Sequence, residues 1–139
     1  YMVKLGTNVQ EIIDHCGGIT GEDVVLKMGG PMMGLALMDD ELPVLKQNNA
    51  ILAFSQEDAA VDPITPCIRC GRCVAACPMQ LMPTDIARAY SAKDVDAMKR
   101  LDVATCMECG SCAYSCPAHR PIVQTMRMAK EAVRQASIK

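Results

Sequence analysis

The sequence is poor in aromatic residues, in clustered charge and in long apolar runs. It has one Phe, three Tyr and no Trp, and its eleven Met residues are flexible enough to fill a core in their place. The net charge of −2 at pH 7 is spread along the chain, which argues against the clustered basic face that nucleic acids require. No apolar run approaches the roughly 18 residues typical of a membrane-spanning helix. We therefore predict no nucleic-acid partner and no membrane span.

The sequence also lacks an initiator methionine and a signal peptide. It opens with YMVKLG, as though a strand were already under way. We expect these 139 residues to be a fragment of a longer protein whose missing part holds an active site.

Nine cysteines leave three uses open, namely disulfides, zinc sites and iron–sulfur clusters. An odd number is awkward for a closed disulfide framework, and nothing marks the chain as exported, so free thiols in a reducing compartment are favoured. Eight of the nine fall in two copies of the phrase C-x2-C-x2-C-x3-C-P. These copies are CIRCGRCVAACP at 67–78 and CMECGSCAYSCP at 106–117.

This phrase is the bacterial pattern that holds [4Fe–4S] clusters. The first three cysteines of each copy wrap around one cluster, and the fourth ligates the cluster of the other copy. Structural zinc instead uses two C-x2-C pairs for one tetrahedral site. We therefore predict two clusters with exchanged ligands. The first is held by Cys67, Cys70, Cys73 and Cys116, and the second by Cys106, Cys109, Cys112 and Cys77.

No residues typical of catalysis accompany these cysteines. The sequence shows no base–nucleophile pair, and the glycine-rich stretch GGPMMG at 29–34 lacks the Lys-Ser/Thr of a phosphate-binding loop. Two clusters without a substrate site indicate electron transfer.

The ninth cysteine, Cys16, lies in TNVQEIIDHCGG at 7–18. This stretch predicts a helix capped by Thr7. Val9, Ile12, Ile13 and Cys16 share its apolar face, since they are spaced i, i+3, i+4, i+7. We therefore expect Cys16 to lie in a core.

The remaining elements predict an α+β protein. Residues 24–30 and 50–56 are apolar and β-branched, as in strands. The acidic, proline-containing stretch 57–66 is expected to be a linker between residues 1–56 and a mostly helical region, residues 67–139. Helices are expected at 83–91, 94–102 and 121–136. The last has Pro121 in its first turn and a buried stripe of Ile122, Val123, Met126, Ala129 and Val133.

Taken together, KMGGPMMG, PVLKQNNAILAF and PCIRCGRCVAACPMQLMPTDI resemble one family. The chain is similar along nearly its whole length to the C-terminal part of the C subunit of the Rnf electron transport complex, an ion-translocating ferredoxin:NAD oxidoreductase. The resemblance implies a soluble-ligand-binding β-grasp piece at 1–56 and a two-cluster ferredoxin-like domain at 67–139. It also implies FMN and NADH in a preceding flavin domain of the same polypeptide. The implied partners are the other subunits of a membrane-bound complex, with this one peripheral on the cytoplasmic side of the cell membrane.

Other interpretations share only part of these features. An iron–sulfur subunit of another oxidoreductase, or a stand-alone two-cluster ferredoxin, would share the cysteines but not GGPMMG and the α+β piece before them. A zinc-stabilised interaction module is the alternative from another class.

The two cysteine phrases differ in charge. Arg69 and Arg72 in the first correspond to Glu108 and Ser111 in the second. Positive charge near a cluster favours the added electron, so we predict the higher reduction potential for the first cluster.

Overall fold

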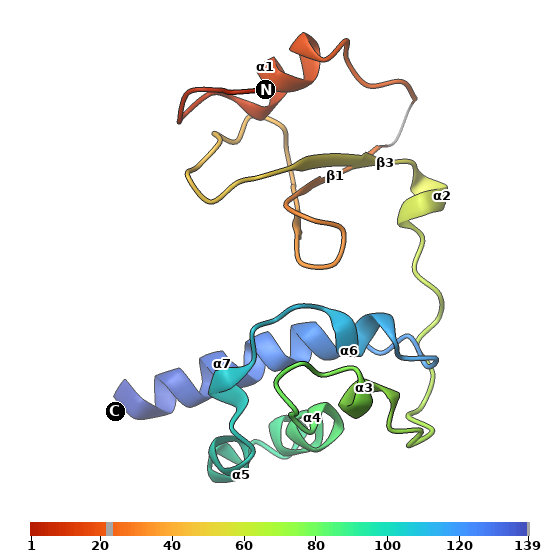
Figure 1. The fold of residues 1–139 in the computed structure, drawn as a ribbon, viewed down its shortest axis with the longest axis vertical. Coiled ribbons are helices and arrows are strands. Elements are labelled where there is room, and N and C mark those ends of the chain that lie inside the picture. Colours follow the sequence, from red (N-terminus) through yellow and green to blue (C-terminus); the bar gives the residue numbers. More distant parts are fainter. Residues whose placement is uncertain (22–23, 139) are drawn as a thin grey trace. The chain divides into compact units, whose positions relative to one another are not determined.

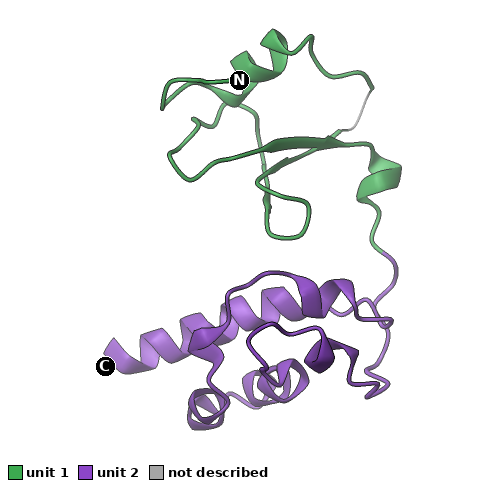
Figure 2. Ribbon diagram, in the orientation of Figure 1, with its two compact units in different colours: residues 1–61 green, residues 62–139 purple. Residues whose placement is uncertain are grey.

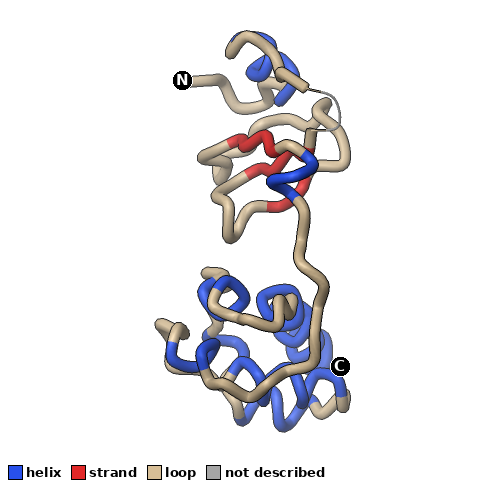
Figure 3. The backbone as a smooth tube through the Cα atoms, turned by 90° about the vertical axis from the view of Figure 1, so that its right-hand side faces the viewer, coloured by secondary structure: helices blue, strands red, loops and turns tan. Residues whose placement is uncertain are grey.

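The structure, a computed structural model, describes residues 1–21 and 24–138. The chain divides into two compact units, Tyr1–Val61 and Asp62–Lys139 (Figure 2). Unit 1 holds a small sheet and unit 2 is helical (Figures 1 and 3). This mixture agrees with the predicted α+β fold class.

Unit 1 contains a three-stranded antiparallel sheet in the order β2-β1-β3. The strands are β1 (Val25–Met28), β2 (Leu35–Ala36) and β3 (Ile51–Phe54), and the helices are α1 (Val9–His15) and α2 (Gln56–Ala59). The register pairs Val25 with Phe54 and Lys27 with Ala36. The sequence therefore located β1 and β3 correctly, but the two-residue strand β2 was not predicted.

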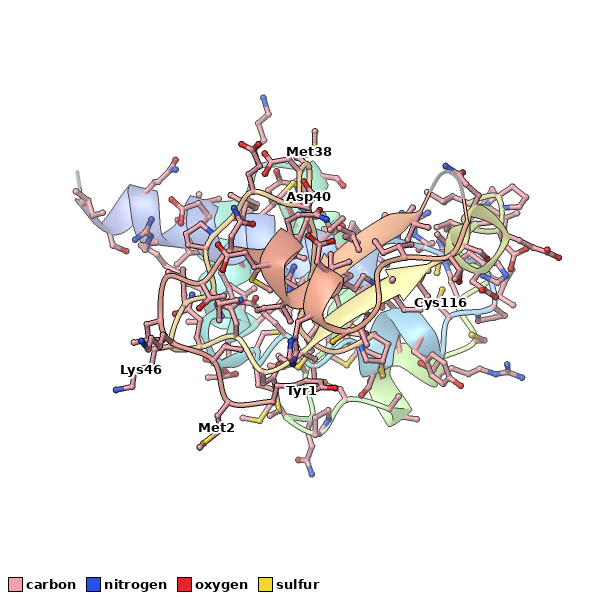
Figure 4. All side chains as sticks on the ribbon, turned by 90° about the horizontal axis from the view of Figure 1, so that it is seen from above. Tyr1, Met2, Met38, Asp40, Lys46 and Cys116 are labelled. Atoms are coloured by element: carbon pink, nitrogen blue, oxygen red, sulfur yellow. The ribbon has the colours of Figure 1, made fainter. Side chains whose placement is uncertain are left out.

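The core of unit 1 is small. Its buried residues are Val9, Ile13 and Val44, whereas Met2 and Met38 are almost fully exposed and point away from the ribbon (Figure 4). These three side chains contribute at most about 5–9 kcal/mol of hydrophobic stabilisation, at roughly 1.5–3 kcal/mol for each fully buried side chain.

Two details of helix α1 correct the sequence analysis. The N-cap is Asn8, whose side-chain oxygen accepts a hydrogen bond from the Gln10 amide at 2.9 Å, while the Thr7 hydroxyl donates to the Lys4 carbonyl. Cys16 is exposed, not buried. It is the C-cap of the helix, with its amide bonded to the Ile12 carbonyl at 3.1 Å, and it lies beside Ile12 and Ile13 at the edge of a cavity of about 400 Å³ rather than inside the core.

The stretch GGPMMG forms the turn between β1 and β2. The Gly34 amide donates to the Gly30 carbonyl at 2.8 Å, and Lys27 Nζ donates to the Pro31 carbonyl at 3.0 Å. A Cβ on Gly34 would lie 2.7 Å from the Gly30 carbonyl oxygen and 2.9 Å from that of Met28, whereas a Cβ on Gly30 would meet nothing within 4 Å. Glycine is therefore required by packing at position 34 but not at position 30.

Unit 2 is built from helices around a single core. They are α3 (Arg72–Ala75), α4 (Pro83–Ser91), α5 (Val95–Arg100), the 3-10 helix η1 (Val103–Thr105), α6 (Ser111–Tyr114) and α7 (Ile122–Ile138). Helix α7 packs against α4 and α5. The predicted stripe of α7 is confirmed, because Ile122, Met126 and Ala129 are buried while Val123 and Val133 pack against the core.

The repeat of the cysteine phrase is also a repeat of backbone conformation. Each loop has a residue in the left-handed region at its third position, Arg69 and Glu108, both with φ of 57°. A glycine with positive φ then caps each short helix, Gly71 before α3 and Gly110 before α6. Since nothing lies within 4 Å of a Cβ built on Gly71, its left-handed conformation is what calls for glycine there.

The repeat continues past the fourth cysteine of each phrase. Gln80 and His119, 39 residues apart, both have positive φ, and their amides donate to the carbonyls of Cys77 and Cys116. The longer helices α4 and α7 then begin 39 residues apart as well. Unit 2 therefore consists of two similar halves, each with a cysteine loop, a short helix and a longer helix.

Candidate metal centres

The two halves bring the eight cysteines of the phrases together in two groups. One group surrounds a cavity of about 580 Å³ and the other a cavity of about 20 Å³. The first cavity is lined by Cys67, Cys70, Cys73 and Cys116, and the second by Cys77, Cys106, Cys109 and Cys112. In each group, three cysteines come from one loop and the fourth from the other half.

The two groups differ in exposure. Cys67 and Cys70 are exposed in the first group, whereas Cys106 and Cys109 are half-buried in the second. The third cysteine of each loop, Cys73 or Cys112, is buried in the common core. The first centre is therefore open to solvent and the second is largely covered.

Burial changes the acidity of the two core cysteines. It raises the pKa of Cys73, with smaller contributions from the negative charges of Cys116 and Cys67. Burial, with smaller contributions from Cys106 and Cys109, raises the pKa of Cys112 to about 11. Both are therefore protonated at neutral pH, and a bound metal must displace these protons because thiolate is the ligand.

Three hydrogen bonds involve sulfurs of the second group. The Leu81 amide donates to Cys77 Sγ and the Glu108 amide to Cys106 Sγ, each at 3.4 Å. Cys109 Sγ lies 3.4 Å from the Ser111 hydroxyl, and this hydrogen bond lowers the pKa of Cys109. Such hydrogen bonds stabilise thiolates and set the potentials of iron–sulfur clusters.

These donor sets suit a [4Fe–4S] cluster, which needs one thiolate for each of four irons. The first cavity has room for such a cluster as it stands. The second, at about 20 Å³, has room for little more than one water, so its lining side chains would have to shift to admit a cluster. Within residues 1–21 and 24–138, no three His, Cys, Asp or Glu side chains converge closely enough to hold a single metal ion.

A group of charged residues beside the second centre was not predicted. Glu108 Oε2 accepts from Arg127 Nε at 3.0 Å and its Oε1 accepts from Lys130 Nζ at 2.6 Å. Lys130 also donates to the Cys106 carbonyl at 3.0 Å. The hydrogen bond from Lys130 is the main reason that the pKa of Glu108 lies below its ordinary value. The i, i+3 spacing on α7 was visible in the sequence, but its acidic partner lies 19 and 22 residues away.

This ion pairing corrects the premise of the predicted order of potentials. Glu108 and its two partners together carry a single positive charge, so the second loop is not negative. A comparison of Arg69 with Glu108 alone therefore overestimates the difference in charge between the surroundings of the two centres.

The comparison with protein families identifies the class of this unit. Residues 66–119 match the family described as a 4Fe-4S dicluster domain.

Curated relatives extend the match to most of the chain. It is 47% identical over 128 residues to the C subunit of the "Ion-translocating oxidoreductase complex" of Rhodobacter capsulatus. The aligned residues make up 92% of this chain and 25% of that protein. It is 43% identical over 137 residues to the C subunit of the "Proton-translocating ferredoxin:NAD(+) oxidoreductase complex" of Clostridium ljungdahlii, with 97% and 30% covered. For the C subunit of the "Na(+)-translocating ferredoxin:NAD(+) oxidoreductase complex" of Acetobacterium woodii, the identity is 41% over 132 residues, with 94% and 30% covered.

These relatives confirm the resemblance to the C subunit of this kind of complex. The chain spans only 25–30% of the length of the three. No helix within the described part of the chain is long and apolar enough to cross a membrane.

Proposed function

We propose that this chain relays electrons through two [4Fe–4S] clusters within an ion-translocating ferredoxin:NAD oxidoreductase complex. The observation that carries this proposal is the grouping of the cysteines. Each cavity draws three cysteines from one phrase and the fourth from the other, Cys116 in the first and Cys77 in the second. The dicluster family match and the names of the relatives support the same role.

When bound, each cluster accepts and releases one electron. The chain's own part is to hold the two centres near each other and to set their surroundings. Cys73 and Cys112 belong to one hydrophobic core, so the exchange of Cys77 and Cys116 would link the two halves through both clusters. Burial of the second centre would exclude water, while amides that donate to Cys77 and Cys106 would stabilise the reduced state.

We further propose that residues 1–56 are part of a soluble-ligand-binding β-grasp domain. A sheet of antiparallel strands with one packed helix is compatible with that fold. The similarity to relatives covers 92–97% of this chain and therefore includes this unit. A stand-alone ferredoxin would not need such a unit.

We also propose the remaining features that the resemblance to the C subunit implies. A flavin domain with FMN and NADH would lie in the remainder of the polypeptide, and the other subunits of the complex would be the partners. The whole polypeptide would be peripheral on the cytoplasmic side of the membrane. The named ion differs between relatives, a proton in one and Na⁺ in another.

Metal analysis of this chain, produced and handled without oxygen, tests the proposal. We expect about eight irons and about eight sulfides per chain, and an electron paramagnetic resonance signal on reduction. A colourless protein that contains zinc and no iron would show that the unit is a scaffold.

A further inference from the structure

Cations gather at the rim of the first cavity. Arg69, Arg88 and Arg120 line it together with one carboxylate, Asp85. Arg72 is exposed at the start of helix α3, directly after the same loop. We call these four arginines the arginine rim.

Most of the arginine rim is not neutralised within the described residues. Asp85 pairs with Arg88 at 3.3 Å, and both side chains are exposed. No ion pair of unit 2 involves the other three arginines in the part of the chain that the structure describes. The rim therefore presents a net positive charge around the two exposed cysteines of this centre, Cys67 and Cys70.

The second cavity has no comparable rim among the residues that the structure describes. The two cations of α7 beside it, Arg127 and Lys130, pair with Glu108. Its other lining residues are mainly apolar, for example Met79 and Met107. Free positive charge and solvent exposure thus coincide at the first centre.

From this coincidence we propose that the arginine rim docks the acidic surface of a one-electron carrier protein, which exchanges electrons with the chain at the first centre. The proposal rests on the proposed relay function. In the exchange, one partner loses an electron and the other gains it, and no bond forms or breaks. Electron-transfer encounters are small and transient, and complementary charge speeds and orients such encounters.

An anionic membrane surface is the other partner that positive charge attracts. The arrangement favours a protein, because the arginines surround a hollow lined by cysteines. A lipid surface would gain nothing from that placement, whereas an electron carrier needs a short path to the sulfurs.

The test measures binding of an acidic flavodoxin to the cluster-loaded chain at low and high salt. The first variant, Arg69→Glu with Arg72→Ser, gives the first loop the residues of the second. Glu108 has the same φ of 57° as Arg69, so this backbone accepts glutamate. The control, Lys99→Glu with Arg100→Ser, makes the same charge change at exposed residues of α5 outside both cavities.

We expect the loop variant to weaken binding about tenfold at low salt, the control to change it less than about twofold, and salt to weaken the unaltered chain's binding. If both variants lose affinity equally, only net charge matters and the rim is not a docking site. Binding to phosphatidylglycerol vesicles but not to flavodoxin would also overturn the proposal, in favour of a membrane contact.

Iron content, measured on every variant, separates this inference from the proposed function. An unaltered chain without iron would refute the relay, whatever its affinity for flavodoxin. If the loop variant loses its iron, the single variant Arg69→Gln, which removes one charge, is tested in its place. Arg69→Gln must then weaken binding more than Lys99→Gln, and equal effects would refute the docking proposal.

Discussion

Lys130 Nζ donates a hydrogen bond to the main-chain carbonyl of Cys106 at 3.0 Å and so attaches the second cysteine loop to helix α7. The corresponding position of the first half makes a different contact. Ser91 stands 39 residues before Lys130, and its hydroxyl donates to Ala87 within helix α4. The two halves of unit 2 thus have similar backbones but are stabilised by different side-chain contacts.

Lys130→Met should loosen the second loop, because it removes the hydrogen bonds to Cys106 and Glu108 while keeping an apolar stem. We expect a loss of about 1–2 kcal/mol in the free energy of unfolding, seen as a lower urea midpoint of the cluster-loaded chain by circular dichroism. The matched control is Lys99→Met, at an exposed position. If the two variants have equal midpoints, Lys130 contributes no specific stabilisation.

Arg69→Gln should lower the reduction potential of the first cluster. Removal of one positive charge at about 10 Å costs roughly 0.4–1.7 kcal/mol for effective dielectric constants between 80 and 20, or roughly 20–70 mV for one electron. An anaerobic redox titration monitored by paramagnetic resonance measures the shift. An unchanged potential at both clusters would mean that solvent screens this arginine completely.

Gly34→Ala should destabilise unit 1, since its Cβ would lie 2.7 Å from the carbonyl oxygen of Gly30. We expect a loss of about 1–3 kcal/mol, seen as faster amide hydrogen exchange in β1 and β3. Gly30→Ala is the control, with space around its Cβ. Equal exchange in the two variants would contradict the crowding at position 34.

Partial removal of iron by a chelator, followed by alkylation, should label the first loop first. Cys67 and Cys70 are exposed, whereas Cys106 and Cys109 are half-buried, so mass spectrometry should find the first pair modified several times faster. Cys16, exposed and outside both cysteine cavities, should react before any iron is removed. Faster labelling of Cys106 and Cys109 would reverse the assignment of the open centre.

Elements that depend on local sequence were predicted well. Helix α4 was expected at 83–91 and is observed at Pro83–Ser91, because its proline start and apolar spacing act within a few residues. The short helices α3 and α6 were missed, since each depends on a glycine in the left-handed conformation and spans only four residues. The burial of Cys16 was wrongly predicted because apolar spacing shows which residues share a face but not whether another element covers that face at Cys16, which lines an open cavity.

Contacts between segments that are distant in the chain could not be predicted from the sequence. The partners of Glu108 lie on another helix, and no local pattern selects them. The two cysteine phrases are the exception, because their chemistry prescribes a long-range exchange of ligands. The crossed assignment stays a prediction until the clusters themselves are observed.

The most direct test of the account is an anaerobic crystal structure of the cluster-loaded chain with iron located by anomalous scattering. The account predicts two four-iron centres, with Cys116 Sγ bound to the centre of Cys67, Cys70 and Cys73, and Cys77 Sγ bound to the other. Finding Cys77 and Cys116 each bound to the centre of its own phrase, or bound to no iron, would contradict it.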